Sequence, residues 1–321
     1  MSRRRTPLLL AAAAAGGAAL ALGAPRALER RWAGAPDPTG GRPLVLPDGE
    51  ELTVDALDGG SLAVLACGPP DAPVVLLGHG WTEDRRVWGP VAQRLVAGGL
   101  RVVVYDQRGH GRSSAGAAGH TIDAIGDDVA AIVRHLDLRE AVLAGHSMGG
   151  MALQSFAGRH PELLAERARH LVLVSTAAGN LVRAFPGFNR VALAALTHPV
   201  AHRVAAAPRF GRILVRGAHG ERPALSHLAA TQEMYVGTPA LTRGEFFTAM
   251  GTMDLTAGLA RISVPTTVVV GSRDQLTPRR HSEVLASSIP GARLEVIRGA
   301  GHQLPFEAPD RLANILAGDP P

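Results

Sequence analysis

The stretch AVLAGHSMGGMALQSFAGRH, residues 141–160, decides the fold. It begins as a short apolar run, turns at Gly145-His146-Ser147-Met148-Gly149-Gly150 and continues with the apolar spacing of a helix. A buried strand that leads directly into a helix is the unit from which parallel sheets are built. The serine between glycines allows two interpretations. It is a nucleophile held on a strained strand-to-helix turn, or the segment is an ordinary glycine-rich turn.

Strands and helices alternate along most of the chain. This alternation predicts an α/β fold with a mainly parallel central sheet that helices cover on both faces. A hairpin is expected to come first, formed by 51–57 and 61–67 around Asp58-Gly59-Gly60. Further strands are predicted at 73–80, 100–106, 141–145, 169–176, 266–274 and 292–299, and helices at 85–97, 122–136, 151–160, 278–289 and from 305 onward.

The chain has 321 residues, of which 46% are hydrophobic, so it is long enough to bury a large core. The single cysteine, Cys67, excludes an intramolecular disulfide. The segments are expected to be a signal sequence or N-terminal membrane anchor at 1–32, a linker at 33–50, a first part of the core at 51–177, a helical lid at 178–251 and a second part of the core at 252–321.

The N-terminus is typical of exported or membrane-anchored proteins. Arg3, Arg4 and Arg5 precede an uncharged, Ala-rich run that extends from Thr6 to Pro25. We therefore expect export or membrane association through this segment. The alternative is an Ala-rich leader on a cytoplasmic enzyme.

Charge is uneven along the sequence. Residues 1–32 have a net charge of +5, which equals the net charge of the whole chain, so the remainder is balanced. All positive residues are arginines, and the balanced part contains no dense basic stretch. Binding to nucleic acid is therefore not expected.

Three residue types that together perform acyl transfer follow predicted strands. Ser147 needs a base, and His302 lies in the loop after the last strand; Asp274, after the strand before that, can orient the histidine. The alternative, without a role in catalysis, is that His302 is a histidine on a surface loop and Asp274 an aspartate that begins a helix. Because the carboxyl ends of parallel strands meet at one edge of a sheet, we expect the three to meet there.

An oxyanion formed during acyl transfer needs two backbone N–H donors. The residue after the nucleophile, Met148, supplies one. The loop after the strand at 73–80 supplies the other, from Trp81. At the turn itself, Gly145 and Gly149 provide the small residues that the sharp bend needs, and His146 lies between the strand and the serine.

From about Leu44 onward the chain resembles the α/β-hydrolases, specifically bacterial esterase- and lipase-like members. The resemblance rests on HGW (79–81), DQRGHGRS (106–113), GHSMGG (145–150), GSRDQLTP (271–278) and GAGHQLPFEAP (299–309). It implies a Ser147–His302–Asp274 triad, with GHSMGG as the nucleophile elbow and HGW as an oxyanion donor. It implies that no cofactor or metal is needed.

The expected activity is hydrolysis of a carboxylic ester through an acyl-enzyme. The alternatives are a lactonase, thioesterase, acyltransferase or haloperoxidase-like enzyme that uses the same triad, or a non-catalytic binding protein. A small-molecule or lipid-like ester is the expected substrate. Candidate residues of its pocket are Phe246, Phe247 and Met250 in the predicted lid.

Three acidic residues are interpreted as having no part in catalysis. Asp106 is expected to brace its loop by pairing with an arginine such as Arg108 or Arg112. The pair Asp127-Asp128 is expected to lie on a solvated helix face.

His198 and His202 have helical spacing but no evident third ligand, so a solvent-facing pair is expected rather than a metal site.

Overall fold

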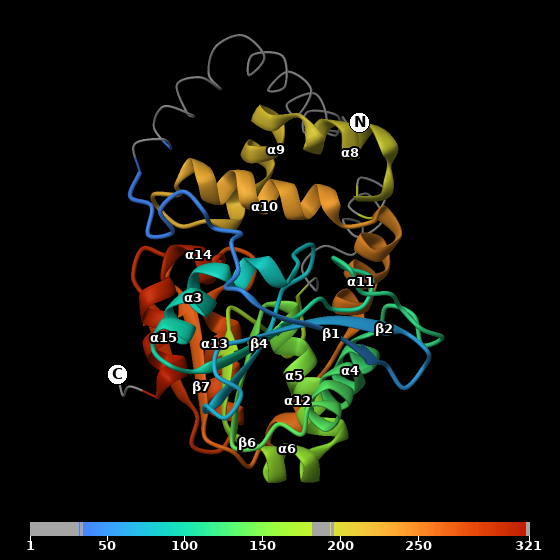
Figure 1. Ribbon diagram of the computed structural model, residues 1–321. Helices are drawn as coiled ribbons and strands as arrows, with labels where there is room; N and C mark the ends of the chain where they lie inside the picture. The colour runs from blue at the N-terminus through green and yellow to red at the C-terminus, as the bar shows by residue number, and fades with distance from the viewer. Residues whose placement is uncertain (1–31, 33–34, 182–192, 194–195, 319–321) are drawn as a thin grey trace, which may run out of the picture.

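The computed structural model describes residues 32, 35–181, 193 and 196–318. Its centre is one sheet in the order β1-β2-β4-β3-β5-β6-β7-β8 (Figure 1). The hairpin β1–β2 and the pair β2–β4 are antiparallel, and all the other strand pairs are parallel. The strands are β1 Gly49–Asp55, β2 Ser61–Cys67, β3 Val74–Gly78, β4 Arg101–Tyr105, β5 Ala141–His146, β6 Ala168–Val174, β7 Thr266–Gly271 and β8 Arg293–Ile297.

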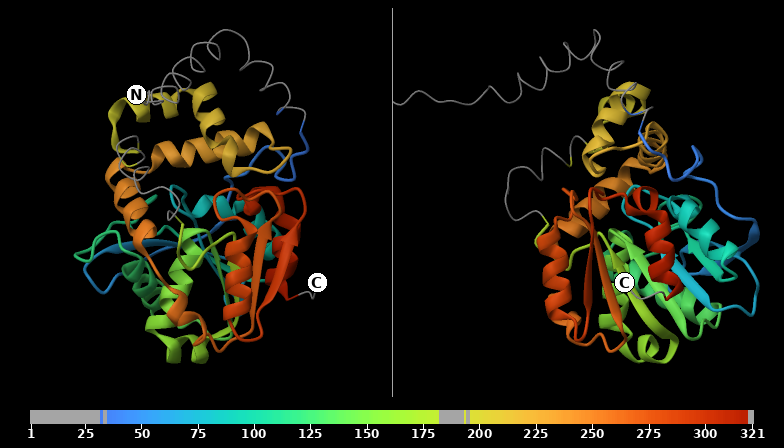
Figure 2. Two further views of the ribbon diagram at one scale, coloured as in Figure 1. Left: turned by 180° about the vertical axis from the view of Figure 1, so that it is seen from behind. Right: turned by 90° about the vertical axis from the view of Figure 1, so that its left-hand side faces the viewer.

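Helices cover both faces of this sheet, as Figure 2 shows from two further sides. Alternating strand residues explain why: Leu76 packs with α4 and α5 on one face, while Val75 and Leu77 pack with α3 and α15 on the other. Side chains buried on both faces are what a continuous apolar strand predicts. The helices of the core are η1 Arg85–Trp88, α3 Gly89–Ala97, α4 Ile122–His135, α5 Met148–Arg159, α6 Pro161–Arg167, α12 Thr256–Leu259, α13 Arg279–Ser288, α14 Leu304–Glu307 and α15 Pro309–Ala317. The α/β fold expected from the alternation is therefore confirmed.

A separate group of helices lies beyond one edge of the sheet, at the top of Figure 1. The chain leaves the core near Ala178, whose carbonyl accepts a hydrogen bond from the N–H of Leu255, where the chain returns (2.7 Å). These elements, called the cap helices below, are α8 Pro199–Ala206, α9 Pro208–Val215, η2 Arg216–Ala218, α10 Leu225–Gly237 and α11 Ala240–Thr252.

At the N-terminus the structure describes Trp32 and then residues 35 onward. The predicted leader at 1–32 therefore lies outside the described residues except for Trp32. Among the helices that are described, none is long and apolar enough to cross a bilayer. The segment boundaries given above remain predictions.

Candidate active site

Ser147 stands at the junction of β5 and α5 in a strained backbone conformation, with φ 51° and ψ −115°. Positive φ is rare for residues with a side chain and is costly to hold. The surroundings fix it: the Ser147 N–H donates to the carbonyl of Val174 (2.9 Å), and the Thr176 hydroxyl donates to the Ser147 carbonyl (2.7 Å). Ser147 is therefore locked at the end of the strand, in front of the first turn of α5.

The glycines around this serine are required by space. A Cβ on Gly145 would collide with the backbone of Gly149, and one on Gly149 would collide with the carbonyl of Gly78 on the neighbouring strand. The turn is thus packed backbone against backbone, which explains the glycines at both positions of the elbow.

His302 and Asp274 are in direct contact. His302 Nδ1 lies 2.9 Å from Asp274 Oδ2, and both side chains are almost fully buried. Asp274 also accepts hydrogen bonds from the N–H groups of Leu276 and Thr277 and from the Thr277 hydroxyl, each at 2.9 Å. Burial opposes ionisation of Asp274, but His302 and the Thr277 bonds outweigh it and hold its pKa at about 2. Asp274 is therefore an ionised partner that fixes the orientation of the imidazole.

The loop that carries His302 is braced from the cap. The N–H of His302 donates to the carbonyl of Ala218 in η2 (2.9 Å). The partly buried carboxylate of Glu307 accepts from the N–H groups of Gly301 (3.1 Å) and Gly220 (2.7 Å), which joins the two loops. Burial raises the pKa of Glu307 in spite of these bonds. This role of Glu307 was not predicted, because the sequence shows it only as part of the GAGHQLPFEAP motif.

Met148 follows Ser147 directly, and Trp81 lines the same cavity as Ser147. The backbone N–H groups of these two residues make no hydrogen bond to any described residue. The intervening Gly80 differs, because its N–H donates to Glu83 Oε2 (2.6 Å). A Cβ on Gly80 would lie 3.1 Å from the Ser147 Cβ, so the loop runs close over the serine. Neither N–H group is therefore engaged by another described residue, and their role as oxyanion donors stays a prediction.

A buried charged pair that was not predicted from the sequence lies beneath this loop. Glu83 Oε2 is 3.0 Å from His146 Nδ1, and His146 Nε2 is 2.8 Å from the carbonyl oxygen of His302. Both partners of His146 are acceptors, so both of its ring nitrogens must donate and the imidazole is charged. The second oxygen of Glu83 accepts from the Gln303 side chain at 2.9 Å.

The pKa shifts agree with a charged pair. Burial would raise the pKa of Glu83, but His146 and the hydrogen bonds lower it to about 2. Burial likewise opposes protonation of His146, but Glu83 outweighs it and raises its pKa. Glu83 therefore connects the Gly80 loop to both His146 and the residue after His302.

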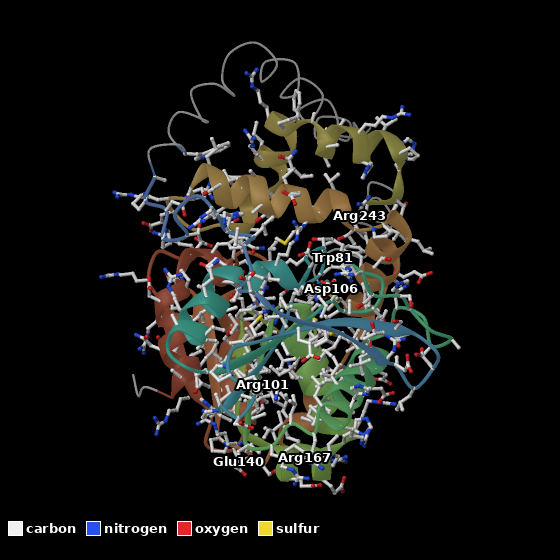
Figure 3. All side chains as sticks on the ribbon, viewed as in Figure 1. Trp81, Arg101, Asp106, Glu140, Arg167 and Arg243 are labelled. Carbon is white, nitrogen blue, oxygen red and sulfur yellow. The ribbon has the colours of Figure 1, made fainter. Side chains whose placement is uncertain are left out.

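Ser147 and His302 both line a cavity of about 600 Å³ between the core and the cap helices. Phe247 and Met250 line it as expected, and the indole of Trp81 lies against the ring of Phe247 with centroids 5.9 Å apart. The Trp81 indole N–H donates to the backbone carbonyl of Arg243 (3.2 Å), and Figure 3 places these two residues at the boundary between cap and core.

The expectation for Phe246 requires correction. Its ring does not line this cavity but is fully buried against the rings of His110 and His120, at 5.5 and 5.2 Å between centroids. Successive residues of a helix point about 100° apart, and in α11 the direction toward the cavity is that of Phe247.

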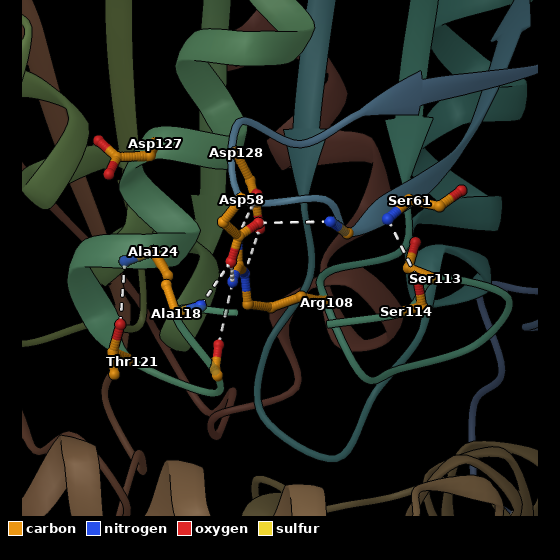
Figure 4. Close-up of polar contacts among 12 residues, drawn as sticks. Asp58, Ser61, Arg108, Ser113, Ser114, Ala118, Thr121, Ala124, Asp127 and Asp128 are labelled. Atoms are coloured by element: carbon orange, nitrogen blue, oxygen red, sulfur yellow. Dashed lines mark hydrogen bonds and ion pairs between the residues drawn. The ribbon is translucent and has the colours of Figure 1, made fainter. Parts of the chain in front are cut away.

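The expectation that Asp106 braces its loop agrees with the structure, whereas the expectation for Asp128 does not. Asp106 does brace its loop, because it accepts hydrogen bonds from the backbone N–H groups of Arg85 (2.8 Å) and Arg112 (3.0 Å). The arginine that pairs with it is Arg85, at 3.7 Å, and not Arg108 or the Arg112 side chain. The solvated face expected for Asp128 is wrong. Asp128 is buried and pairs with Arg108 (2.6 Å), which also binds Asp58 (2.8 Å), as Figure 4 shows. The partner lies 20 residues away in the sequence, so helix periodicity alone could not reveal it.

A parallel sheet with a serine on a strand-to-helix turn and a His–Asp pair in the same cavity defines the class of α/β-hydrolases. Comparison with known proteins agrees, because residues 73–309 match the model of the alpha/beta hydrolase fold family. The chain belongs to this family and is an enzyme of the hydrolase type.

Several relatives cover most of the chain. A non-heme haloperoxidase of Rhodococcus erythropolis is 31% identical over 71% of this chain and 85% of its own length. A bifunctional esterase/perhydrolase of Acinetobacter calcoaceticus is 30% identical over 78% and 93%. A thermophilic esterase from Thermogutta terrifontis has a similar structure, with a TM-score of 0.69 and 27% identity over 84% of this chain and 97% of its own.

Proposed function

We propose that the chain hydrolyses carboxylic esters through a covalent acyl-enzyme on Ser147. His302 Nε2 takes the proton of the Ser147 hydroxyl as Oγ attacks the ester carbonyl. The oxygen of the tetrahedral intermediate accepts hydrogen bonds from the Trp81 and Met148 N–H groups. His302 then gives its proton to the leaving alkoxide, and the alcohol departs.

Deacylation repeats these steps with water. His302 takes a proton from water as its oxygen attacks the acyl carbon, and the same proton returns to Ser147 Oγ when the acid leaves. Asp274 stays ionised throughout and stabilises the imidazolium that forms twice in each cycle.

The observation that carries the proposal is the contact between His302 Nδ1 and Asp274 at 2.9 Å. This contact occupies one ring nitrogen with the carboxylate and leaves Nε2 as the nitrogen that can accept a proton. His302 and Ser147 share one cavity, and the serine is held at positive φ where the first turn of α5 begins. Several aliphatic and aromatic residues line the same cavity, which favours an ester with an apolar acyl group.

A second activity on the same acyl-enzyme is favoured by the relatives. One is named an esterase/perhydrolase and another a haloperoxidase. If hydrogen peroxide replaces water in deacylation, the products are a peracid and the free serine. Lactonase, thioesterase and acyltransferase activities would differ only in the leaving group or the acceptor.

The test is labelling with a fluorophosphonate probe, followed by turnover of p-nitrophenyl esters of increasing chain length. We expect wild-type protein to be labelled and the Ser147→Ala variant to be neither labelled nor active. Adding hydrogen peroxide to the ester assay and trapping the peracid measures the second activity. Equal turnover by Ser147→Ala and wild type would refute the mechanism.

A further inference from the structure

Charge is polarised between the cap and the core of the folded chain. Among the described residues, 196–251 contain six arginines and three glutamates, whereas 35–181 and 252–318 together contain 19 arginines and 23 acidic residues. The outer helices α8 and α9, with the η2 turn, contain arginines at positions 203, 209, 212 and 216 and no acidic residue. One end of the molecule is therefore basic, while the rest is acidic.

The same two helices expose large apolar side chains. Val200 and Val204 are 55% and 51% exposed on α8, and Phe210 and Leu214 are 39% and 59% exposed on α9. Each pair is four residues apart, so its members lie on one side of their helix. Figure 1 shows α8 and α9 as the layer farthest from the sheet. Apolar side chains flanked by arginines are the composition of helices that lie on membrane surfaces.

This surface reaches the cavity. Leu214 belongs both to the exposed side of α9 and to the cavity lining, and Leu276, which is 54% exposed, lines the cavity from the core side. Leu214 thus connects the exposed side of α9 with the cavity that contains Ser147.

The N-terminal segment also ends at the cap. Trp32 is buried against Val215 of α9 and Leu228 of α10. Trp32 is therefore held on the cap side of the molecule and not on the acidic core.

We propose that the outer face of α8 and α9 docks on an anionic phospholipid surface. Val200, Val204 and Phe210 enter the interfacial region, and the arginines pair with lipid phosphates. The docked orientation turns the Leu214 side of the cavity toward the lipid. Lipid-like esters would then reach Ser147 without crossing water. This docking goes beyond the proposed hydrolysis, and the binding itself does not require catalysis.

A local reporter tests the docking in the full-length protein. The only native cysteine, Cys67, is buried, so Val204→Cys can be labelled with an environment-sensitive fluorophore. The matched control is Leu57→Cys, because Leu57 is 73% exposed on the β1–β2 hairpin of the core. Vesicles of phosphatidylcholine are compared with vesicles in which about a third of the lipid is phosphatidylglycerol.

We expect the label at 204 to shift to shorter wavelength with the anionic vesicles only, and the label at 57 not to shift. Adding Arg203→Glu and Arg209→Glu should weaken the vesicle affinity reported by the label at 204 about tenfold or more, whereas Arg139→Glu on the core should not change it. An unchanged label at 204 overturns the proposal, even if the protein sediments with the vesicles. An equal shift with pure phosphatidylcholine overturns the role of the arginines.

The outcome is separable from that of the proposed function. Ser147→Ala should dock as the wild type does, because Ser147 lies inside the cavity and not on the outer face. Docking by an inactive protein, or hydrolysis by a protein that does not dock, distinguishes failure of one proposal from failure of the other.

Discussion

At the scale of single residues, the contact between Asp274 and His302 leads to a direct prediction. Asp274→Asn should keep the packing but remove the charge that stabilises the imidazolium and selects its tautomer. In serine proteases this change lowers kcat by about four orders of magnitude. We expect a loss of about a thousandfold or more in kcat for a p-nitrophenyl ester. Asp310→Asn, at an exposed carboxylate far from the cavity, is the control and should retain full activity.

Glu83 leads to a second residue-scale prediction. Glu83→Gln leaves His146 buried without its counter-ion, which typically costs about 3–5 kcal/mol of unfolding free energy. Because Glu83 also holds the Gly80 N–H and Gln303, kcat should fall while KM changes little. Urea unfolding and steady-state kinetics measure the two effects. Glu283→Gln, at an exposed side chain on α13, is the control.

The same pair has a characteristic pH dependence. His146 has a raised pKa in the folded protein, so its contribution to stability is complete below about 6.5 and is lost as pH rises through the folded pKa. Glu83 has a lowered pKa of about 2, so its contribution is lost as pH falls from about 4.5 toward 2. The stability difference between wild type and Glu83→Gln should therefore be largest near pH 5–6. A difference independent of pH would contradict the charged pair.

The sequence was sufficient to find Ser147, Asp274 and His302, because each directly follows an apolar strand and lies in a short motif. It could not reveal Glu83. Its partners lie 63 and 220 residues away, and HGWTED has no feature that marks its glutamate as buried. Side chains that act across loops become visible only when the fold brings those loops together.

At the scale of elements, the adjacent phenylalanines of α11 make a matched pair. Phe246 is fully buried against two histidine rings, whereas Phe247 lines the cavity beside Trp81. Phe246→Ala should lower the unfolding free energy by about 3–5 kcal/mol and leave the preference for acyl chain length unchanged. Phe247→Ala should cost less stability and shift the preference toward longer acyl chains, because it enlarges the cavity.

Thermal unfolding and a series of p-nitrophenyl esters measure both variants. If the two substitutions change the preference for acyl chain length equally, the assignment of Phe247 and not Phe246 to the cavity lining is wrong. The sequence identified α11 as a lining element but could not choose between its two phenylalanines, because the rotation of a helix about its axis is set by packing. For α11 that packing includes Arg243, whose buried guanidinium donates to the carbonyls of Tyr235 and Thr238.

Strands were the elements most accessible from sequence. Continuous apolar runs predicted the strands that became β3, β4, β5, β6 and β7, since each is buried on both faces. Helix α4 was placed correctly, but its polar face was misjudged at Asp128. A buried aspartate has the same periodicity as an exposed one, and only its arginine partner distinguishes them.

At the scale of the whole molecule, buried histidines and carboxylates set the response to acid. Burial lowers the pKa values of His110 and His219 to about 3. An unfolded chain binds a proton at each of these positions below about 6.5, but the folded protein does not. Stability must therefore fall as pH decreases from about 6.5 toward 3, since the unfolded state takes up more protons.

Carboxylates act in a lower pH range. Asp274 and Glu83 have folded pKa values of about 2, below their ordinary values, so their contribution is lost between about pH 4.5 and 2. We expect the unfolding free energy to decline in two overlapping steps, the first from the histidines and the second from the carboxylates.

Urea unfolding at closely spaced pH values separates the steps. His219→Gln can retain bonds to the Val215 carbonyl and the Thr231 hydroxyl but cannot titrate. Between pH 6.5 and 3, the slope of its unfolding free energy against pH should therefore be smaller than in the wild type by the equivalent of about one proton. The step below pH 4.5 should stay as in the wild type. His135→Gln, at the end of α4 and outside the buried set, is the matched control. An unaltered slope in His219→Gln would mean that His219 is protonated in the folded protein and that burial does not govern its charge.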